Sequence, residues 1–193
     1  MAVAGIIAEY HPFHRGHAWQ IASLRDRIGE DTAVVVAMSG NFVQRGDFAV
    51  FGKHSRAEMA LAGGADLVLE IPTPWASATA ERFAQGGTSI LAATGVVTHL
   101  VFGCESGDAA PLAAVADGLK DPRYPELLRR CLTEGLPFAA ARQSALSELI
   151  GSAAETLGKP NNALAVEYLR SLSLYAPSIV PLALPRKQEI ISA

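Results

Sequence analysis

Short, almost wholly apolar runs alternate with helix-like segments along this chain, and this alternation is its strongest constraint on the fold. Candidate strands lie at residues 2–8, 32–38, 66–71, 99–103 and 178–184. Runs without polar alternation are typical of parallel strands that are covered on both faces. Amphipathic helical patterns separate them at residues 16–28, 54–62 and 80–94. We therefore predict an α/β fold, a Rossmann-like, doubly wound parallel sheet of about five strands.

A helix-rich region interrupts this alternation in the second half of the chain. Helical patterns follow one another from residue 111 to 173, separated by glycine and proline. We predict a Rossmann-like core at residues 1–110, a helical insertion at 111–175, and a last strand and tail at 176–193 that complete the core. Pro181 lacks a backbone N–H, which places the last strand at an edge of the sheet.

Charge and cysteine content exclude several classes of protein. The 193 residues have a formal net charge of −3, so the chain lacks the basic character of a domain that mainly grips nucleic acid. Any RNA contact must be local or supplied by further sequence. Cys104 and Cys131 form no CxxC pair, which argues against a zinc site or disulfide framework. The first apolar run lacks a positive leader, and no stretch is long and apolar enough for a membrane span. We predict a cytoplasmic protein with no membrane partner.

The chemistry is concentrated at residues 9–17, which read EYHPFHRGH, between the first strand and the first helix. A helix N-terminus presents unpaired N–H groups and a positive dipole end that suit phosphate. Gly16 allows a ligand to approach the backbone closely. His14 and His17 can point at the same ligand and donate hydrogen bonds to phosphate oxygens. The alternative is a capped helix start with incidental histidines.

This segment resembles the HxGH signature of the nucleotidyltransferase superfamily, whose members attack the α-phosphate of ATP and release pyrophosphate. Longer segments are similar to the tRNA(Met) cytidine acetate ligase family, in the same order along the chain. They lie at residues 5–17, 38–46, 53–61, 65–72, 83–91, 102–108 and 160–164. The similarity spans residues 3 to about 187.

The resemblance implies an enzyme that activates acetate with ATP as acetyl-adenylate. The acetyl group then passes to N4 of the wobble cytidine of elongator tRNA(Met). His14, His17 and Lys53 are the implied catalytic residues, and we expect Mg²⁺ to bridge the phosphates. The implied ATP-binding residues are Ile7, Ala8, Glu9, Tyr10, His11, Pro12, Phe13, His14, Arg15, Gly16, His17, Ala18, Trp19, Gln20, Gly103, Asn161, Asn162, Arg186 and Lys187. Of the two asparagines, which also form an N-cap arrangement, we favour Asn162.

Two further polar segments are candidates for substrate or tRNA contact. Gln44 and Arg45 follow the second strand and could meet acetate or the cytidine; the alternative is an ordered loop with Arg45 in a salt bridge. Lys53 and Arg56 begin the next helix. They could stabilise pyrophosphate or hold RNA phosphate, or belong to a solvated helix face.

The chain departs from the family at His11 and Arg15, where asparagine is usual, and neither residue touches the HxGH pattern. Members of the family normally continue into a second domain of comparable size that is thought to help hold the tRNA. We therefore expect this chain to represent the catalytic half without the usual C-terminal domain. Two rival functions remain: a small-molecule adenylyltransferase of the HxGH superfamily, and a non-catalytic ATP-binding remnant.

Overall fold

Five parallel strands form one sheet in the order β3-β2-β1-β4-β5 within residues 1–105 and 107–185, which the computed structural model describes. The strands are β1 Val3–Ala8, β2 Ala33–Ser39, β3 Leu67–Ile71, β4 His99–Cys104 and β5 Val180–Pro185. All neighbouring pairs among them are parallel. The predicted doubly wound parallel sheet is confirmed, and β5, which carries Pro181, is an edge strand as expected.

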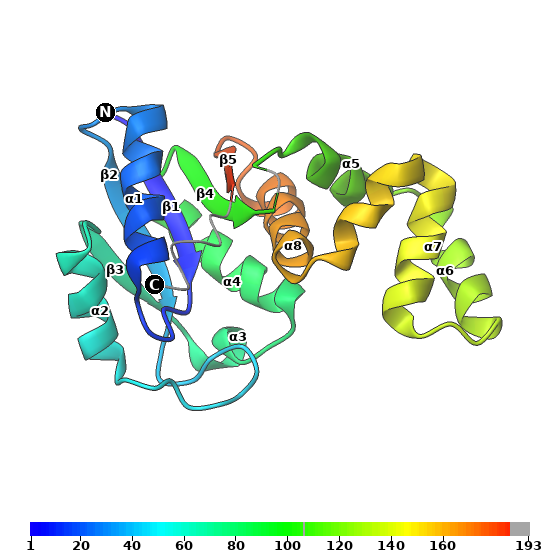
Figure 1. Ribbon diagram of the computed structural model, residues 1–193, viewed down its shortest axis with the longest axis horizontal. Helices are drawn as coiled ribbons and strands as arrows, with labels where there is room; N and C mark the ends of the chain where they lie inside the picture. The colour runs from blue at the N-terminus through cyan, green and yellow to red at the C-terminus, as the bar shows by residue number, and fades with distance from the viewer. Residues whose placement is uncertain (106, 186–193) are drawn as a thin grey trace.

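Helices cover both faces of the sheet (Figure 1). Their bounds are α1 Arg15–Ile28, α2 Lys53–Ala62, α3 Thr73–Ala76, α4 Ala80–Ala93, α5 Ala110–Gly118, α6 Tyr124–Thr133, α7 Phe138–Ile150, the 3-10 helix η1 Gly151–Gly158 and α8 Pro160–Tyr175. The apolar faces of α1 and α2 pack on one side of β1 and β2, through Ile21, Leu24 and Ala60. The larger cluster on the other side joins α4 and α8 to the sheet. Both faces are therefore buried, which explains the nearly continuous apolar strands.

The helical region extends away from the sheet. In Figure 1, α6 and α7 lie at the end of the molecule opposite α2 and β3, and α5 and η1 connect them to the core. The last helix, α8, packs against α4 and β4 instead. The predicted division at residues 110 and 175 stays a prediction, with α8 contributing to the main core. Every helix among the described residues is too short or too polar to cross a lipid bilayer; the predicted cytoplasmic location stays a prediction.

Strands β1 and β4 separate before their carboxyl ends. The β1–β2 ladder runs from Val3 to Ala8, whereas the β1–β4 ladder pairs only Ala4 and Gly5 of β1. The strand order of the sheet reverses at β1, since β2 lies on one side of β1 and β4 on the other. Ligands of such sheets bind in the crevice at the carboxyl ends of strands at this switch point.

Leu91 tests the packing of α4 on the first strand. It is 1% exposed, and its Cδ1 lies 2.8 Å from where a Cβ on Gly5 would be, so helix and strand are in direct contact. Leu91→Ala should lower the free energy of unfolding by about 2–5 kcal/mol, because it leaves a cavity in the core. The measurement is urea denaturation followed by circular dichroism. Leu174→Ala, at a position 64% exposed on α8, is the control and should change stability little; equal losses would contradict the described packing.

Candidate functional site

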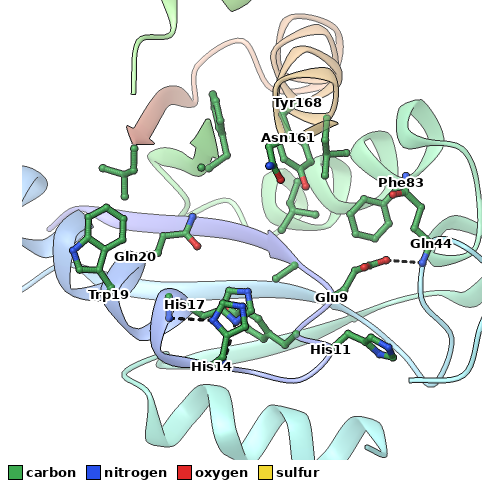
Figure 2. A pocket seen from close by; sticks show the side chains of 18 of the residues that line it. Glu9, His11, His14, His17, Trp19, Gln20, Gln44, Phe83, Asn161 and Tyr168 are labelled. Atoms are coloured by element: carbon green, nitrogen blue, oxygen red, sulfur yellow. Dashed lines mark hydrogen bonds between the residues drawn. The ribbon is translucent and has the colours of Figure 1, made fainter. Parts of the chain in front are cut away.

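A cavity of about 470 Å³ opens at the carboxyl edge of the sheet, where β1 and β4 separate. This is within the size range of small-molecule and cofactor sites. Its lining comes from the segment after β1, from α1, α4 and α8, and from the ends of β4 and β5 (Figure 2). The lining residues are Ile7, Ala8, Glu9, Tyr10, His11, Pro12, His14, Gly16, His17, Trp19, Gln20, Gln44, Phe83, Phe102, Gly103, Asn161, Leu164, Tyr168, Leu184 and Pro185.

His14 and His17 form a reciprocal capping box at the start of α1. The Gly16 N–H donates to Nδ1 of His14 at 3.0 Å, and the His14 N–H donates to Nδ1 of His17 at 3.2 Å. The two imidazole rings stack with centroids 3.7 Å apart. Capping groups of this kind satisfy N–H groups that a helix start otherwise leaves unpaired. Two histidines thus do here what Ser or Thr and Glu usually do.

These two hydrogen bonds determine which nitrogen of each neutral imidazole ring carries the proton. An Nδ1 that accepts a backbone N–H cannot carry a proton, so the neutral imidazole must carry its proton on Nε2. Nε2–H is then a hydrogen-bond donor on the edge of each ring away from the capping bond, and both rings line the cavity. The first turn of α1 contains no acidic residue, so the positive end of the helix dipole is not offset there. The site is therefore suited to an anionic group such as phosphate.

Arg56 holds the segment between β1 and α1 in place through a hydrogen bond to its backbone. Its side chain has no exposed surface, and its guanidinium donates to four backbone carbonyls: Phe51 O at 3.0 Å, Ser39 O at 3.1 Å, Gly40 O and Glu9 O. The planar, five-donor guanidinium is the side chain that can satisfy such a set. Burial lowers the pKa of Arg56, and the carboxylates of Glu9 and Glu70 oppose that shift. The predicted contact of Arg56 with substrate or tRNA is wrong, because the side chain is sealed inside the protein.

Tyr10 is the strained residue of this loop. Its φ of 46° lies in the left-handed region, which a bulky side chain adopts at a cost on the order of 1–3 kcal/mol. Its ring is buried and packs against Phe13 and His17, with centroids 4.9 and 4.7 Å away. Burial also raises the pKa of its hydroxyl. The Arg56 bond to the preceding carbonyl, of Glu9, and this ring packing together oppose relaxation of the strain.

Glu9 places a carboxylate in the cavity. Its Oε1 accepts the Gln44 N–H at 2.5 Å, which connects the segment after β1 to the loop after β2 (Figure 2). Among the described residues that line the cavity, Glu9 is the one carboxylate. Tyr168 faces it from α8: burial, and then the charge of Glu9, raise the pKa of the tyrosine hydroxyl. Tyr168 therefore stays neutral, as a possible hydrogen-bond donor, at any ordinary pH.

The structure reverses our preference between the two asparagines. Asn162 is buried, accepts the Glu105 N–H at 3.0 Å and donates to Thr156 O at 3.1 Å, so its amide is used in joining β4 to η1. Asn161 lines the cavity, and its Nδ2 donates to Oε1 of Glu105 at 3.0 Å. Neither is an N-cap, because α8 already begins at Pro160. Asn161 is the better placed to reach a ligand.

Lys53 lies outside this cavity. Its ammonium pairs with Oε2 of Glu70 at 2.6 Å and lines a separate, smaller hollow of about 190 Å³ between α2 and the sheet. The structure therefore does not bring Lys53 into the cavity with His14 and His17, and its catalytic role stays a prediction. Glu70 itself is half exposed.

The other predicted residues divide between the cavity and its surroundings. Gln44, Gly103, Trp19 and Gln20 are lining residues with most of residues 7–17. Phe13 is core, since its Cζ lies 2.3 Å from where a Cβ on Gly63 would be. Arg15 and Arg45 are exposed, and Ala18 is half-buried, outside the lining. Arg186 and Lys187 lie outside the described residues.

Sequence reasoning missed the apolar walls of the cavity. Phe83, Phe102, Leu164, Tyr168, Leu184 and Pro185 come from α4, β4, α8 and β5. In the sequence these residues match ordinary core positions of helices and strands. No local signal distinguishes an apolar side chain that packs on protein from one that packs on a ligand.

Comparison with known proteins agrees with this fold. The sequence model of the family described as HIGH Nucleotidyl Transferase matches residues 1–192. A tRNA(Met) cytidine acetate ligase of Syntrophomonas wolfei is 44% identical, with 97% of this chain and 46% of the relative covered. One of Caldanaerobacter subterraneus is 42% identical, with 97% and 47% covered. The chain thus spans about half the length of these curated relatives.

A solved structure is similar as well. The crystal structure of Thermotoga maritima TmcAL bound with alpha-thio ATP superposes with a TM-score of 0.90 at 38% sequence identity. The superposition covers 97% of this chain and 47% of that one.

Two substitutions of His14 should separate its capping role from its role toward a ligand. His14→Ala removes the cap and should lower the free energy of unfolding by about 0.5–2 kcal/mol. His14→Asn should lower it less, because asparagine is a preferred N-cap, yet it lacks the imidazole Nε2. Urea denaturation gives the stabilities. Equal destabilisation by both substitutions would contradict the capping role.

Replacing Arg56 should disturb both the fold and the cavity. Arg56→Lys cannot reach four carbonyls, so it should lower the free energy of unfolding by roughly 2–4 kcal/mol. It should also weaken nucleotide binding, measured by calorimetry, because the Glu9 carbonyl is released. Arg27→Lys, at an exposed position of α1, is the matched control. A variant as stable as this control would show that the carbonyl contacts contribute little.

Proposed function

The chain belongs to the HIGH nucleotidyl transferase family, and we propose that it activates acetate with ATP and acetylates N4 of the wobble cytidine of elongator tRNA(Met). The observation that carries the proposal is the His14–His17 pair at the positive end of α1, inside a cavity of about 470 Å³. The names of the curated relatives support acetate and tRNA as substrates. The alpha-thio ATP of the Thermotoga maritima structure supports ATP.

In the first step, a carboxylate oxygen of acetate attacks the α-phosphorus of ATP. The new bond forms opposite the bond to pyrophosphate, which breaks, and acetyl-adenylate results. Negative charge builds up on the α-phosphate oxygens as this happens. Nε2–H of His14 and His17 donates to those oxygens, and the α1 dipole adds to the stabilisation. Both donors are oriented before the ligand arrives, so little reorganisation is needed.

In the second step, the amino nitrogen of cytidine attacks the acetyl carbon. The C–N bond forms, the bond from the acyl carbon to the adenylate oxygen breaks, AMP leaves, and the amine gives up a proton. No covalent bond to the protein is required. Apolar side chains, among them Phe83, Phe102 and Leu184, keep bulk water from the reactive anhydride.

Mg²⁺ fits this site only as an ion held chiefly by phosphates. No group of three or more His, Cys, Asp or Glu side chains that could hold a metal occurs among residues 1–105 and 107–185. Mg²⁺ often uses one or two carboxylates with substrate phosphates and water, and Glu9 is the carboxylate available in the cavity. Bound there, the ion would neutralise part of the triphosphate charge.

Acetate-dependent exchange of labelled pyrophosphate into ATP tests the first step on this chain alone. The chain should support exchange with acetate and not without it. His17→Ala should slow exchange on the order of a hundred- to a thousandfold, because one donor to the α-phosphate is lost. His54→Ala, an exposed histidine of α2 outside the cavity, is the control and should exchange at the normal rate.

Two outcomes would replace the proposal by a rival. Exchange driven by a mononucleotide and not by acetate would indicate a small-molecule adenylyltransferase. ATP binding with no exchange under any condition would indicate a nucleotide-binding protein without turnover. Transfer to tRNA is measured separately, by mass spectrometry of cytidine from elongator tRNA(Met) after incubation with acetate and ATP.

A further inference from the structure

The loop between β2 and α2, residues 40–52, presents a cluster of exposed apolar side chains beside the cavity. Phe48 is 75% exposed, Val50 63% and Phe51 44%. Such residues are seldom gathered on a surface without a binding role. Figure 1 shows this loop projecting beyond the carboxyl edge of the sheet, the edge at which the cavity opens.

This loop, which we call the 40–52 loop, is held in a defined shape. Phe42 and Phe48 form an antiparallel bridge, and their rings pack with centroids 4.8 Å apart. The Val43 N–H donates to Asp47 O at 3.0 Å, and the Ala49 N–H donates to Asn41 O at 2.9 Å. The exposed Phe48 ring is therefore supported from behind by Phe42.

The same loop is fastened at three points, two of which lie on the cavity wall. The Gln44 N–H donates to Glu9, and the Val50 N–H donates to Nδ1 of His11 at 3.2 Å. Arg56 donates to the carbonyl of Phe51 at the base of the loop. Glu9, His11 and Gln44 all line the cavity. A molecule that rests on Phe48 is thus positioned relative to the reacting groups.

We propose that the 40–52 loop is a stacking platform for an unpaired base of the RNA that delivers the acceptor cytidine. This inference rests on the proposed function. An exposed aromatic ring on a rigid loop suits a base, since every base has a π-face and the ring loses little freedom on binding. Arg45, within the loop, and His54, near the start of α2, are exposed and can meet phosphates, and the exposed Asp47 lies in the same loop. The chain as a whole has a charge of −3, so stacking, more than bulk charge, must supply the contact.

A binding experiment separates this platform from the catalytic site. The probe is a fluorescein-labelled anticodon stem-loop of elongator tRNA(Met), and anisotropy gives its Kd for the whole chain. Phe48→Ala should weaken binding on the order of ten- to a hundredfold, because one base loses its stacking partner. Phe48→Trp should restore it. Phe138→Ala, 62% exposed at the start of α7 on the far side of the molecule, is the matched control and should bind normally.

Salt dependence and exchange complete the test. The loss caused by Phe48→Ala should persist at high salt, whereas Arg45→Ala should reduce the slope of log Kd against log salt by about 1. Phe48→Ala should leave acetate-dependent pyrophosphate exchange unchanged.

If exchange occurs normally but the unsubstituted chain does not bind the stem-loop, or Phe48→Ala binds it equally well, the platform is refuted while the adenylation proposal stands. A chain that self-associates through Phe48, seen by light scattering, would refute it too. Absent exchange with intact stacking would overturn the proposed function alone.

Discussion

The buried guanidinium of Arg56 is the interaction on which the geometry of the site depends. A charge without water is stable only when its hydrogen bonds are satisfied, and here four backbone carbonyls satisfy them. Those carbonyls belong to the segment after β1, the end of β2 and the base of the 40–52 loop. One side chain therefore fixes the strained loop at Tyr10, the approach to α1 and the position of the aromatic loop. These elements cannot move independently without leaving a buried polar group unpaired.

Structure and chemistry coincide at His14 and His17. The Nδ1 atoms that cap α1 also determine that a neutral ring carries its proton on Nε2, so the fold prepares the donors that the proposed reaction needs. The cavity exists because β1 and β4 separate where the strand order reverses, and apolar side chains from distant segments close its sides. The cavity is thus built mainly from one short polar segment and from apolar side chains of distant segments.

The division of labour within longer relatives bears on what this chain can do. It spans about half of the curated ligases that it matches, and described residues of this half line the cavity. The proposed acetate activation uses this cavity, whereas the proposed tRNA modification also needs a surface for RNA on a chain of net charge −3. The 40–52 loop is the part of the described surface where ring chemistry, local cations and proximity to the cavity meet.

Local sequence was sufficient to predict the strands and the position of the histidine segment before the first helix. Apolar periodicity located all five strands to within two residues at each end, because strands buried on both faces tolerate few polar residues. The sequence also placed the polar segment at residues 9–17 at the start of a helix, which the structure confirms, and its binding of a ligand stays a prediction. Tertiary structure decided the rest. Arg56, which the sequence suggested as a free cation, is buried because carbonyls from three separate segments converge on it. Lys53 is paired with Glu70. Asn161, and not Asn162, lines the cavity, and so do Phe83 and Tyr168. Each of these outcomes depends on which distant segments meet, and that information lies in the packing of the whole chain, not in any one stretch of it.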